Sequence, residues 1–327
     1  MSASLSPSIR VRPAPVPDRA FQVGTRGSAL ALTQTRLVAS ALSAAYPGST
    51  CVEQVITTTG DQVQDRRLAD LGGKGLFAKE IDSALLEGRI DFAVHSLKDL
   101  ETELPSGITL ACVLPRADPR DVLVLAPRSQ PVERATPFPM LPAGARIGTA
   151  SARRQAQLLH ARPDLRIGLI RGNVQTRLKR LDSGDFAGTL LALAGLNRLG
   201  LVNDATVILA PEQMVPAAGQ GIIGVTARAD DEHTLRQLER INDAAAYAAA
   251  TAERAVLRAL DGSCHTPIGA YARPLPNGDL LLTAMVARTD GSFLLKRWRR
   301  GSASEATSLG TELGVSLRAD SPADVFA

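Results

Sequence analysis

The residues best suited to acid–base chemistry stand together in the stretch DFAVHSLKDL, residues 91–100. Its apolar half predicts a buried strand, and His95, Ser96, Lys98 and Asp99 stand where that strand ends. A carboxylate beside an ammonium at the end of a hydrophobic strand is a candidate acid–base group. The alternative is a surface ion pair, which contributes little to stability. Asp99 is therefore the candidate for proton transfer.

Arginines recur where predicted strands give way to helices. In GTRGSALAL, residues 24–32, Arg26 precedes Ser28, and a serine at this point can cap the helix that follows. The free N–H groups at the start of a helix favour a bound anion. The motif therefore predicts either an anion site or an ordinary capping serine beside a solvated arginine.

The stretch IGTASARRQAQ, residues 147–157, repeats this arrangement. Ser151 opens a predicted helix, and Arg153 and Arg154 lie in its first turn. Two cations there oppose the helix dipole, which costs some tenths of a kcal/mol. A sequence that tolerates this cost can be using the pair to hold an anion; the alternative is solvated helix charge.

Three further arginines follow predicted strands. Arg171 and Arg177 flank the turn and helix of IRGNVQTRLKR, and Arg198 lies in AGLNRLG. Open α/β sheets bind ligands at the carboxyl ends of their strands, so a polyanion is the expected partner. The chain has no GxxxxGK[ST] or GxGxxG pattern at these turns, and several carboxylates fit as well as phosphate.

Cys264 stands in a Gly-Ser-Cys-His turn within LRALDGSCHTPIGAY. Only Cys51 and Cys112 accompany it, so the sequence encodes neither a disulfide framework nor a CxxC metal site, and we predict no metal. A reducing compartment follows from the same observation. Taken alone, Cys264 can be core filler, a metal ligand, a nucleophile or a covalent anchor.

The elements that must position these residues form two successive βα series and a smaller third unit. Strands and helices alternate from about residue 20 to 113, and a second series runs from DVLVLA to GTLLALAG. This pattern predicts two α/β domains with mostly parallel sheets and a ligand cleft between them, arranged like the two lobes of a periplasmic binding protein. A long Ala-rich helix, three β runs separated by PNGD and TDGS, and a final helix then predict a small α+β domain.

The expected domain boundaries follow from the two crossings between the series, LPRADPRD and LAPEQMVPAAGQG. The segment GIIGVTARA is expected to rejoin the first sheet. The predicted parts are a leader (1–19), a first domain (20–116 with 222–240), a second domain (120–215) and a third (243–327). The segment 127–144 is expected to be a Pro-rich surface loop.

Composition narrows the class of protein. A hydrophobic content of 45% and a charged content of 21% describe a globular chain, and no apolar run is long enough to span a membrane. The net charge of +4 and 3% aromatic residues argue against a nucleic-acid partner. The first twenty residues lack the apolar region of a secretory signal and indicate a disordered leader on a cytoplasmic protein, or an organelle transit segment.

Taken together, these segments resemble the porphobilinogen deaminase family, from about residue 21 to at least 300. The resemblance rests on nine motifs in the same order: TRGSALAL, GGKGLF, AVHSLKD, DPRD, GTASARRQ, RGNVQTRL, LAGLNRLG, PAAGQG and DGSCHTPIGAY. The family joins four porphobilinogen molecules head to tail with loss of ammonia and releases hydroxymethylbilane by hydrolysis. Its cofactor is a dipyrromethane bound to a cysteine by a thioether. The resemblance thus implies a transferase of heme biosynthesis that acts as a monomer on a small molecule.

The resemblance implies roles for individual residues. Asp99 matches the catalytic aspartate, and Cys264 matches the cysteine that anchors the dipyrromethane. Residues matching the binding positions for acetate and propionate groups are Arg26, Ser28, Lys98, Ser151, Arg153, Arg154, Arg171, Arg177 and Arg198. Asp61 and Asp65, in TTGDQVQDR, match the start of a mobile lid, and Lys74, in the glycine-rich stretch LADLGGKGLFAKE, lies further along it. That stretch by itself predicts either an anion cradle or a lid.

Two rival functions remain open on the sequence. A non-catalytic two-lobed receptor for a carboxylated ligand needs the same paired lobes, but it needs neither Asp99 nor a covalent adduct on Cys264. A phosphate- or nucleic-acid-binding protein predicts binding that falls steeply with salt.

Overall fold

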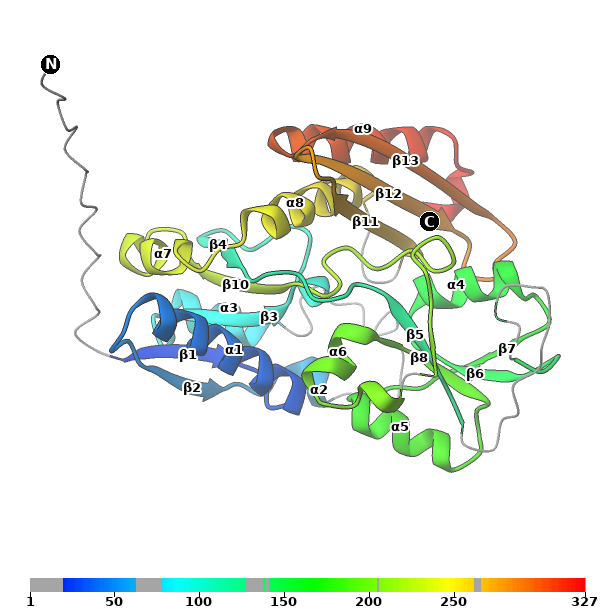
Figure 1. The fold of residues 1–327 in the computed structure, drawn as a ribbon, viewed down its shortest axis with the longest axis horizontal. Helices are drawn as coiled ribbons and strands as arrows, with labels where there is room; N and C mark the ends of the chain where they lie inside the picture. Colours follow the sequence, from blue (N-terminus) through cyan, green and yellow to red (C-terminus); the bar gives the residue numbers. More distant parts are fainter. Residues whose placement is uncertain are drawn as a thin grey trace, which may run out of the picture.

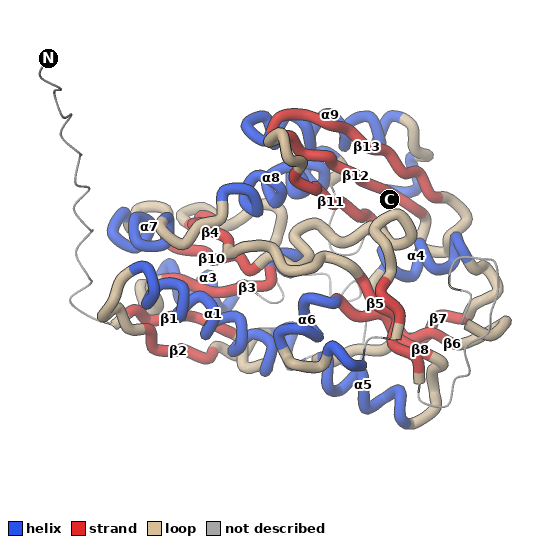
Figure 2. Tube along the Cα trace, viewed as in Figure 1, coloured by secondary structure: helices blue, strands red, loops and turns tan. Residues whose placement is uncertain are grey.

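The computed structural model describes residues 20–62, 78–126, 138, 141–204, 206–261 and 266–326. Within these residues lie two five-stranded sheets and one three-stranded sheet, each with helices packed against it (Figures 1 and 2). The predicted leader and most of the 127–144 loop lie outside the described residues.

The first sheet has the strand order β2-β1-β3-β10-β4. Its strands are β1 (Phe21–Thr25), β2 (Cys51–Val55), β3 (Phe92–Ser96), β4 (Ile108–Val113) and β10 (Ile223–Arg228). β1 pairs in parallel with β2 and β3, whereas β10 pairs antiparallel with β3 and β4. The prediction that GIIGVTARA rejoins the first sheet is confirmed, because that segment contains β10.

The second sheet has the order β7-β6-β8-β5-β9. Its strands are β5 (Asp121–Leu125), β6 (Arg146–Gly148), β7 (Arg166–Gly168), β8 (Gly188–Ala192) and β9 (Val207–Ile208). β5 enters from the first crossing and runs antiparallel to β8 and β9, just as β10 enters from the second crossing in the first sheet. The two sheets therefore share one strand order, which confirms the predicted pair of periplasmic-binding-protein-like α/β lobes.

Helices cover both faces of the sheet in each lobe, which explains why the sequences of the central strands are continuously apolar. In the first lobe, Val38 and Leu42 of α1 pack against Phe92 on one face, and Ile81 and Leu85 of α3 pack on the other. The helices of the two lobes are α1 (Ala29–Ala45), α2 (Thr59–Gln62), α3 (Lys79–Leu86), α4 (Ala152–Ala161), α5 (Val174–Asp182), α6 (Leu193–Arg198) and α7 (Glu232–Glu239).

The third sheet is an antiparallel meander of β11 (Ile268–Pro274), β12 (Asp279–Ala287) and β13 (Leu294–Ser302). Both predicted hairpin turns are present, with Gly278 and Gly291 at positive φ. One face of this sheet is covered by α8 (Ala244–Ala259) and α9 (Ala306–Ala319), which pack against each other; α9 lies at the upper edge of Figure 1. Gly310 of α9 permits this close approach, because a Cβ there would collide with the Ala252 carbonyl oxygen of α8. The predicted α+β unit is thus observed.

None of the helices in the described part of the chain combines the length and the apolar character needed to cross a bilayer.

Candidate active site

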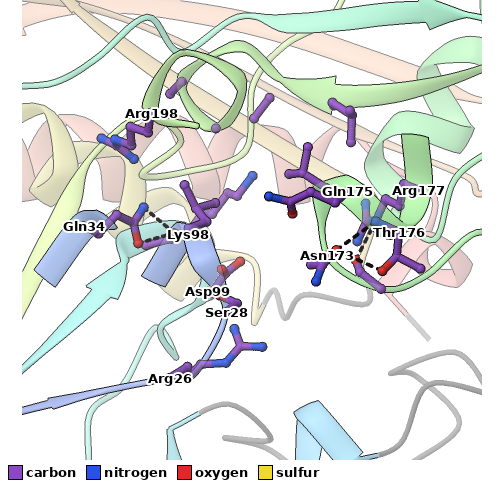
Figure 3. A pocket seen from close by; sticks show the side chains of 18 of the residues that line it. Arg26, Ser28, Gln34, Lys98, Asp99, Asn173, Gln175, Thr176, Arg177 and Arg198 are labelled. Atoms are coloured by element: carbon purple, nitrogen blue, oxygen red, sulfur yellow. Dashed lines mark hydrogen bonds between the residues drawn. The ribbon is translucent and has the colours of Figure 1, made fainter. Parts of the chain in front are cut away.

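A cavity of about 490 Å³ lies between the two lobes, at the carboxyl ends of their strands. Figure 3 shows its two walls, with Arg26, Ser28, Lys98 and Asp99 on one side and the turn containing Arg177 on the other. Ligand sites are expected at this edge of an open α/β sheet. Among the described residues, six cations and two carboxylates line the cavity: Arg26, Lys98, Arg154, Arg171, Arg177, Arg198, Asp61 and Asp99.

Arg26 and Ser28 occupy the turn from β1 into α1. Ser28 is in an extended conformation, and its Oγ accepts a hydrogen bond from the Ala31 N–H at 3.2 Å, so it caps the helix. Ser28 also lines the cavity, so its role as a helix cap does not exclude a role in binding an anion. The Arg26 Nε donates to Asp61 Oδ1 and Oδ2 at 3.2 Å each. Burial would raise the pKa of the Asp61 carboxyl, but hydrogen bonds from Arg26 and Thr58 hold it below its usual value.

Lys98 and Asp99 lie in a 3₁₀ turn, Leu97–Asp99, directly after β3. The fully buried Leu97 side chain fixes this turn against the core, so that Asp99 is exposed to the cavity. The Lys98 Nζ donates to Gln220 Oε1 at 3.3 Å. Burial lowers the pKa of Lys98 to about 8, although the neighbouring Asp99 carboxylate opposes this shift. The interpretation as a simple surface ion pair is therefore wrong for Lys98.

Arg153 and Arg154 are only 5% exposed each, so the interpretation as solvated helix charge is wrong. Both arginines bind the fully buried Asp121: Arg153 Nη1 lies 2.8 Å from Oδ2, and Arg154 Nη2 lies 2.7 Å from Oδ1. Burial would raise the pKa of Asp121, but the two guanidinium groups hold it far below its usual value. Arg154 lines the cavity, whereas Arg153 donates away from it to the Val215 carbonyl oxygen.

Ser151 caps α4, with its Oγ accepting from the Arg154 N–H at 3.3 Å. It does not belong to the described cavity lining, in contrast to its neighbour Ala150. Ser151 and Arg153 are therefore the two predicted binding residues, among those described, that the structure places behind the wall of the cavity.

The opposite wall is the turn from β7 into α5. Gly172 has φ +102°, and a Cβ there would lie 2.8 Å from the Thr176 methyl group, so glycine is required. Arg177 reaches back from α5 to donate its Nε to the Gly172 carbonyl oxygen at 2.9 Å. Burial lowers the pKa of Arg177 to about 10, and the positive charges of Arg154 and Arg171 add to that effect. These cations repel one another and would be stabilised by a bound anion.

Arg198 ends α6 and donates its Nη2 to the Gly221 carbonyl oxygen at 2.7 Å. Burial lowers the pKa of Arg198 to about 10. Arg198 thus joins the second lobe to the second crossing while facing the cavity.

Three buried residues that organise this cavity are not marked by any motif in the sequence: Asp121, Gln220 and Gln34. Asp121 lies in DPRD, Gln220 in the second crossing and Gln34 in α1. Gln34 lines the cavity and exchanges hydrogen bonds with Ser96. Only Asp121 has a signal in the sequence that could have found it: an acidic residue at the start of an apolar strand, in a chain that also contains an Arg-Arg pair. Cys264, Asp65 and Lys74 lie outside the described residues.

The fold and the cavity define a two-lobed α/β protein whose cleft is lined by six cations and two carboxylates, which suits a ligand with several negative charges. Comparison with known proteins supplies the family. Residues 21–236 match the model for the porphobilinogen deaminase dipyrromethane cofactor-binding domain, and residues 247–319 match the model for the C-terminal domain of the same enzymes. The chain therefore belongs to the porphobilinogen deaminase family, and it is a transferase of tetrapyrrole biosynthesis that acts on porphobilinogen.

Similar proteins carry the same name. The chain is 48% identical to the porphobilinogen deaminase of Roseiflexus sp. (strain RS-1) over 90% of this chain and 94% of that one. It is 46% identical to the porphobilinogen deaminase of Paracoccus denitrificans over 95% and 98% of the two chains. Among solved structures, the periplasmic VFT2 domain of Bordetella pertussis BvgS matches with 12% identity and a TM-score of 0.40, over 68% of this chain and 86% of that domain.

The cavity fits the cofactor that this family carries. A dipyrromethane made from two substrate molecules bears acetate and propionate groups, and the lining offers six cations against two carboxylates. Arg154, Arg171 and Arg177 in particular crowd like charges together on one wall, which a ligand rich in carboxylates would neutralise. Lys98 faces them from the other lobe.

Proposed function

We propose that this cleft joins four porphobilinogen molecules head to tail and releases hydroxymethylbilane, with Asp99 as the catalytic residue. The observation that supports this role is the position of Asp99, an exposed carboxylate in a cavity that six cations line, while the other lining carboxylate, Asp61, is paired with Arg26. There the Asp99 carboxylate accepts the pyrrole N–H hydrogen bond and stabilises the positive charge that develops as ammonia leaves. It also accepts the proton released after the new C–C bond forms.

The arginines and Lys98 bind and orient the carboxylates of the substrate and cofactor. Arg26, Ser28 and Lys98 act from the first lobe, and the residues acting from the second lobe are Arg154, Arg171, Arg177 and Arg198. Guanidinium groups suit this task because they bind carboxylates through paired hydrogen bonds. For Ser151 and Arg153, which lie behind the cavity wall, we propose an indirect contribution: Ser151 accepts from the Arg154 N–H, and Arg153 shares the Asp121 carboxylate with Arg154.

We assign the cofactor anchor to Cys264. When bound, the dipyrromethane supplies the pyrrole end to which substrate units are added. Cysteine suits this anchor because a thiolate is a soft nucleophile that attacks the methylene carbon left when ammonia departs from porphobilinogen. The resulting thioether is not hydrolysed under ordinary conditions, so Cys264 would retain the group through every turnover. Asp61, Asp65 and Lys74 are assigned to the lid.

We further propose that the three sheets correspond to three domains, with residues 20–116 and 222–240 in the first, 120–215 in the second and 243–327 in the third. The enzyme is expected to act as a monomer in the cytoplasm, where porphobilinogen is a small diffusible substrate. The reducing cytoplasm would keep a free thiol available on Cys264. Light scattering of the purified chain measures its molar mass in solution and tests whether the protein is a monomer.

The Asp99→Asn variant tests the proposed reaction. Because the side chain is exposed and nearly isosteric, we expect an unchanged thermal unfolding midpoint and at least about a hundredfold loss of ammonia release from porphobilinogen. Asp204→Asn, an exposed aspartate in the turn after α6, is the matched control and should retain wild-type turnover. Ammonia release near the wild-type rate in Asp99→Asn would remove Asp99 from the mechanism.

A further inference from the structure

Gln220 is a fully buried glutamine in the second crossing between the lobes, and it lies behind the wall of the cavity. Its Nε2 donates to the Pro119 carbonyl oxygen at 2.6 Å and to Asp121 Oδ1 at 3.2 Å. Both partners are acceptors, so the amide can be oriented in only one way. The Oε1 atom must then face Lys98, whose ammonium lies 3.3 Å away.

The backbone holds this side chain in position. Gly219 and Gly221 on either side of Gln220 both have positive φ. A Cβ on Gly219 would lie 2.9 Å from the Leu97 side chain, and a Cβ on Gly221 would collide with the Ala117 carbonyl oxygen. Two close approaches therefore press this turn against the 3₁₀ turn on one side and the first crossing on the other.

We propose that Gln220 is a positioning residue, whose amide holds the Lys98 ammonium at the cavity wall and ties it to the Asp121–arginine cluster of the other lobe. The proposal deepens the proposed function, because it rests on the role of Lys98 in binding carboxylates. Asp121 already binds Arg153 and Arg154, so the Gln220 amide joins cations of both lobes into one hydrogen-bonded network.

Several charges act on Lys98 at once. Asp99 and Asp121 favour its protonated form, whereas Arg153 and Arg154 disfavour it, and burial lowers its pKa to about 8. Near neutral pH, the fraction of Lys98 that is protonated therefore depends on the groups that accept hydrogen bonds from its ammonium. The Gln220 oxygen is a neutral acceptor for that charge, and hydrogen bonds to charged groups are stronger than those between neutral groups.

The direct test is the pKa of Lys98, measured by NMR titration of ¹³C-labelled lysine in the full-length protein. The chain contains five lysines, and Lys98→Arg identifies the resonance of Lys98. In the Gln220→Met variant, which lacks the acceptor, we expect the pKa of Lys98 to fall by about one unit.

Gln157→Met is the matched control. Gln157 is also buried and also bonds the second crossing, through the Val215 N–H and carbonyl groups, but it does not contact Lys98. We expect this variant to lose stability while the pKa of Lys98 stays at the wild-type value. An unchanged Lys98 pKa in Gln220→Met, or equal shifts in Gln220→Met and Gln157→Met, would overturn the proposal.

Steady-state kinetics link the residue to function. At neutral pH, kcat/KM of Gln220→Met should fall about tenfold, and the alkaline limb of its pH profile should move in the same direction as the Lys98 pKa. That limb should disappear in Lys98→Arg, because arginine stays protonated. A limb that persists in Lys98→Arg would refute the role of Lys98 in the proposed function, whereas a Lys98 pKa unmoved in Gln220→Met would refute the role of Gln220 alone.

Discussion

The two lobes present arginines to the cleft from similar strand-to-helix turns, but they hold them differently. In the first lobe, Arg26 pairs with Asp61, and the side chains are 24% and 27% exposed. In the second lobe, Arg154 pairs with Asp121, and the side chains are 7% and 0% exposed. The second lobe therefore carries a prebuilt cationic wall, whereas the pair in the first lobe is open to exchange with water or with a ligand.

This difference has a physical basis. A carboxylate buried between two guanidinium groups has no alternative partner, so its removal leaves uncompensated buried charge. The Arg26–Asp61 pair remains in contact with solvent, which screens it and offers substitutes for either partner. The second lobe therefore offers a bound carboxylate cations that are already fixed, whereas the first lobe, which also holds Asp99, offers an arginine whose pair is in contact with solvent.

The largest expected effect is therefore the loss of Asp121. Asp121→Asn should lower the free energy of unfolding by about 3–5 kcal/mol, because Arg153 and Arg154 would share a neutral partner. Urea denaturation monitored by circular dichroism measures this loss. Asp61→Asn serves as the comparison and should cost no more than about 1 kcal/mol. Similar losses in the two variants would contradict the contrast between the lobes.

The same aspartate should govern part of the acid sensitivity. Because the folded-state pKa of Asp121 lies below its ordinary value near 3.8, its stabilising contribution is complete above that value. That contribution is lost progressively as the pH falls below about 4. The stability difference between wild type and Asp121→Asn should therefore shrink on acidification.

An intermediate effect on activity is expected when an arginine is removed from the cavity wall of the second lobe. Arg177→Ala removes a half-buried cation that lines the cavity, so we expect about a tenfold fall in kcat/KM and accumulation of protein carrying an incomplete pyrrole chain. Native mass spectrometry after a short incubation with porphobilinogen detects such intermediates. Lys179→Ala, an exposed cation two residues further along α5, is the control and should complete the chain normally. Wild-type kinetics in Arg177→Ala would assign it a structural role only.

The smallest expected effect is the change that Asp61→Asn makes to the steady-state constants of the reaction. Asp61→Asn weakens the pair that occupies Arg26, so the KM for porphobilinogen should change by no more than about fivefold while kcat stays within twofold. Steady-state ammonia release measures both constants. A loss of kcat as large as that expected for Asp99→Asn would show that the first lobe depends on this pair as strictly as the second depends on Asp121.

Much of this architecture was predictable because it follows from local patterns. The alternation of strands and helices gave the two lobes, and the crossings around DPRD and PAAGQG implied a return to the first sheet. The cationic lining was predictable for Arg171, Arg177 and Arg198, because each follows a strand whose carboxyl end faces the cleft. These inferences need only the order of elements along the chain.

The buried network was not predictable from spacing. Asp121 precedes Arg153 by more than thirty residues, and Gln220 follows Asp121 by about a hundred, so only the folded chain brings them together. The unfavourable position of Arg153 and Arg154 at the start of a helix predicts either a bound anion or solvated charge, and neither alternative names a carboxylate of the chain itself. In the structure, a protein carboxylate takes most of their hydrogen bonds.

The central claim is that the cleft holds a cofactor built from substrate and anchored to Cys264. Intact-mass spectrometry of the purified chain, followed by the same measurement on Cys264→Ala and Cys51→Ala, tests it most directly. We predict an excess equal to two pyrrole units in the wild type and in Cys51→Ala, and the unmodified mass in Cys264→Ala. An unmodified mass in catalytically active wild-type protein, or the same excess in Cys264→Ala, would contradict the account.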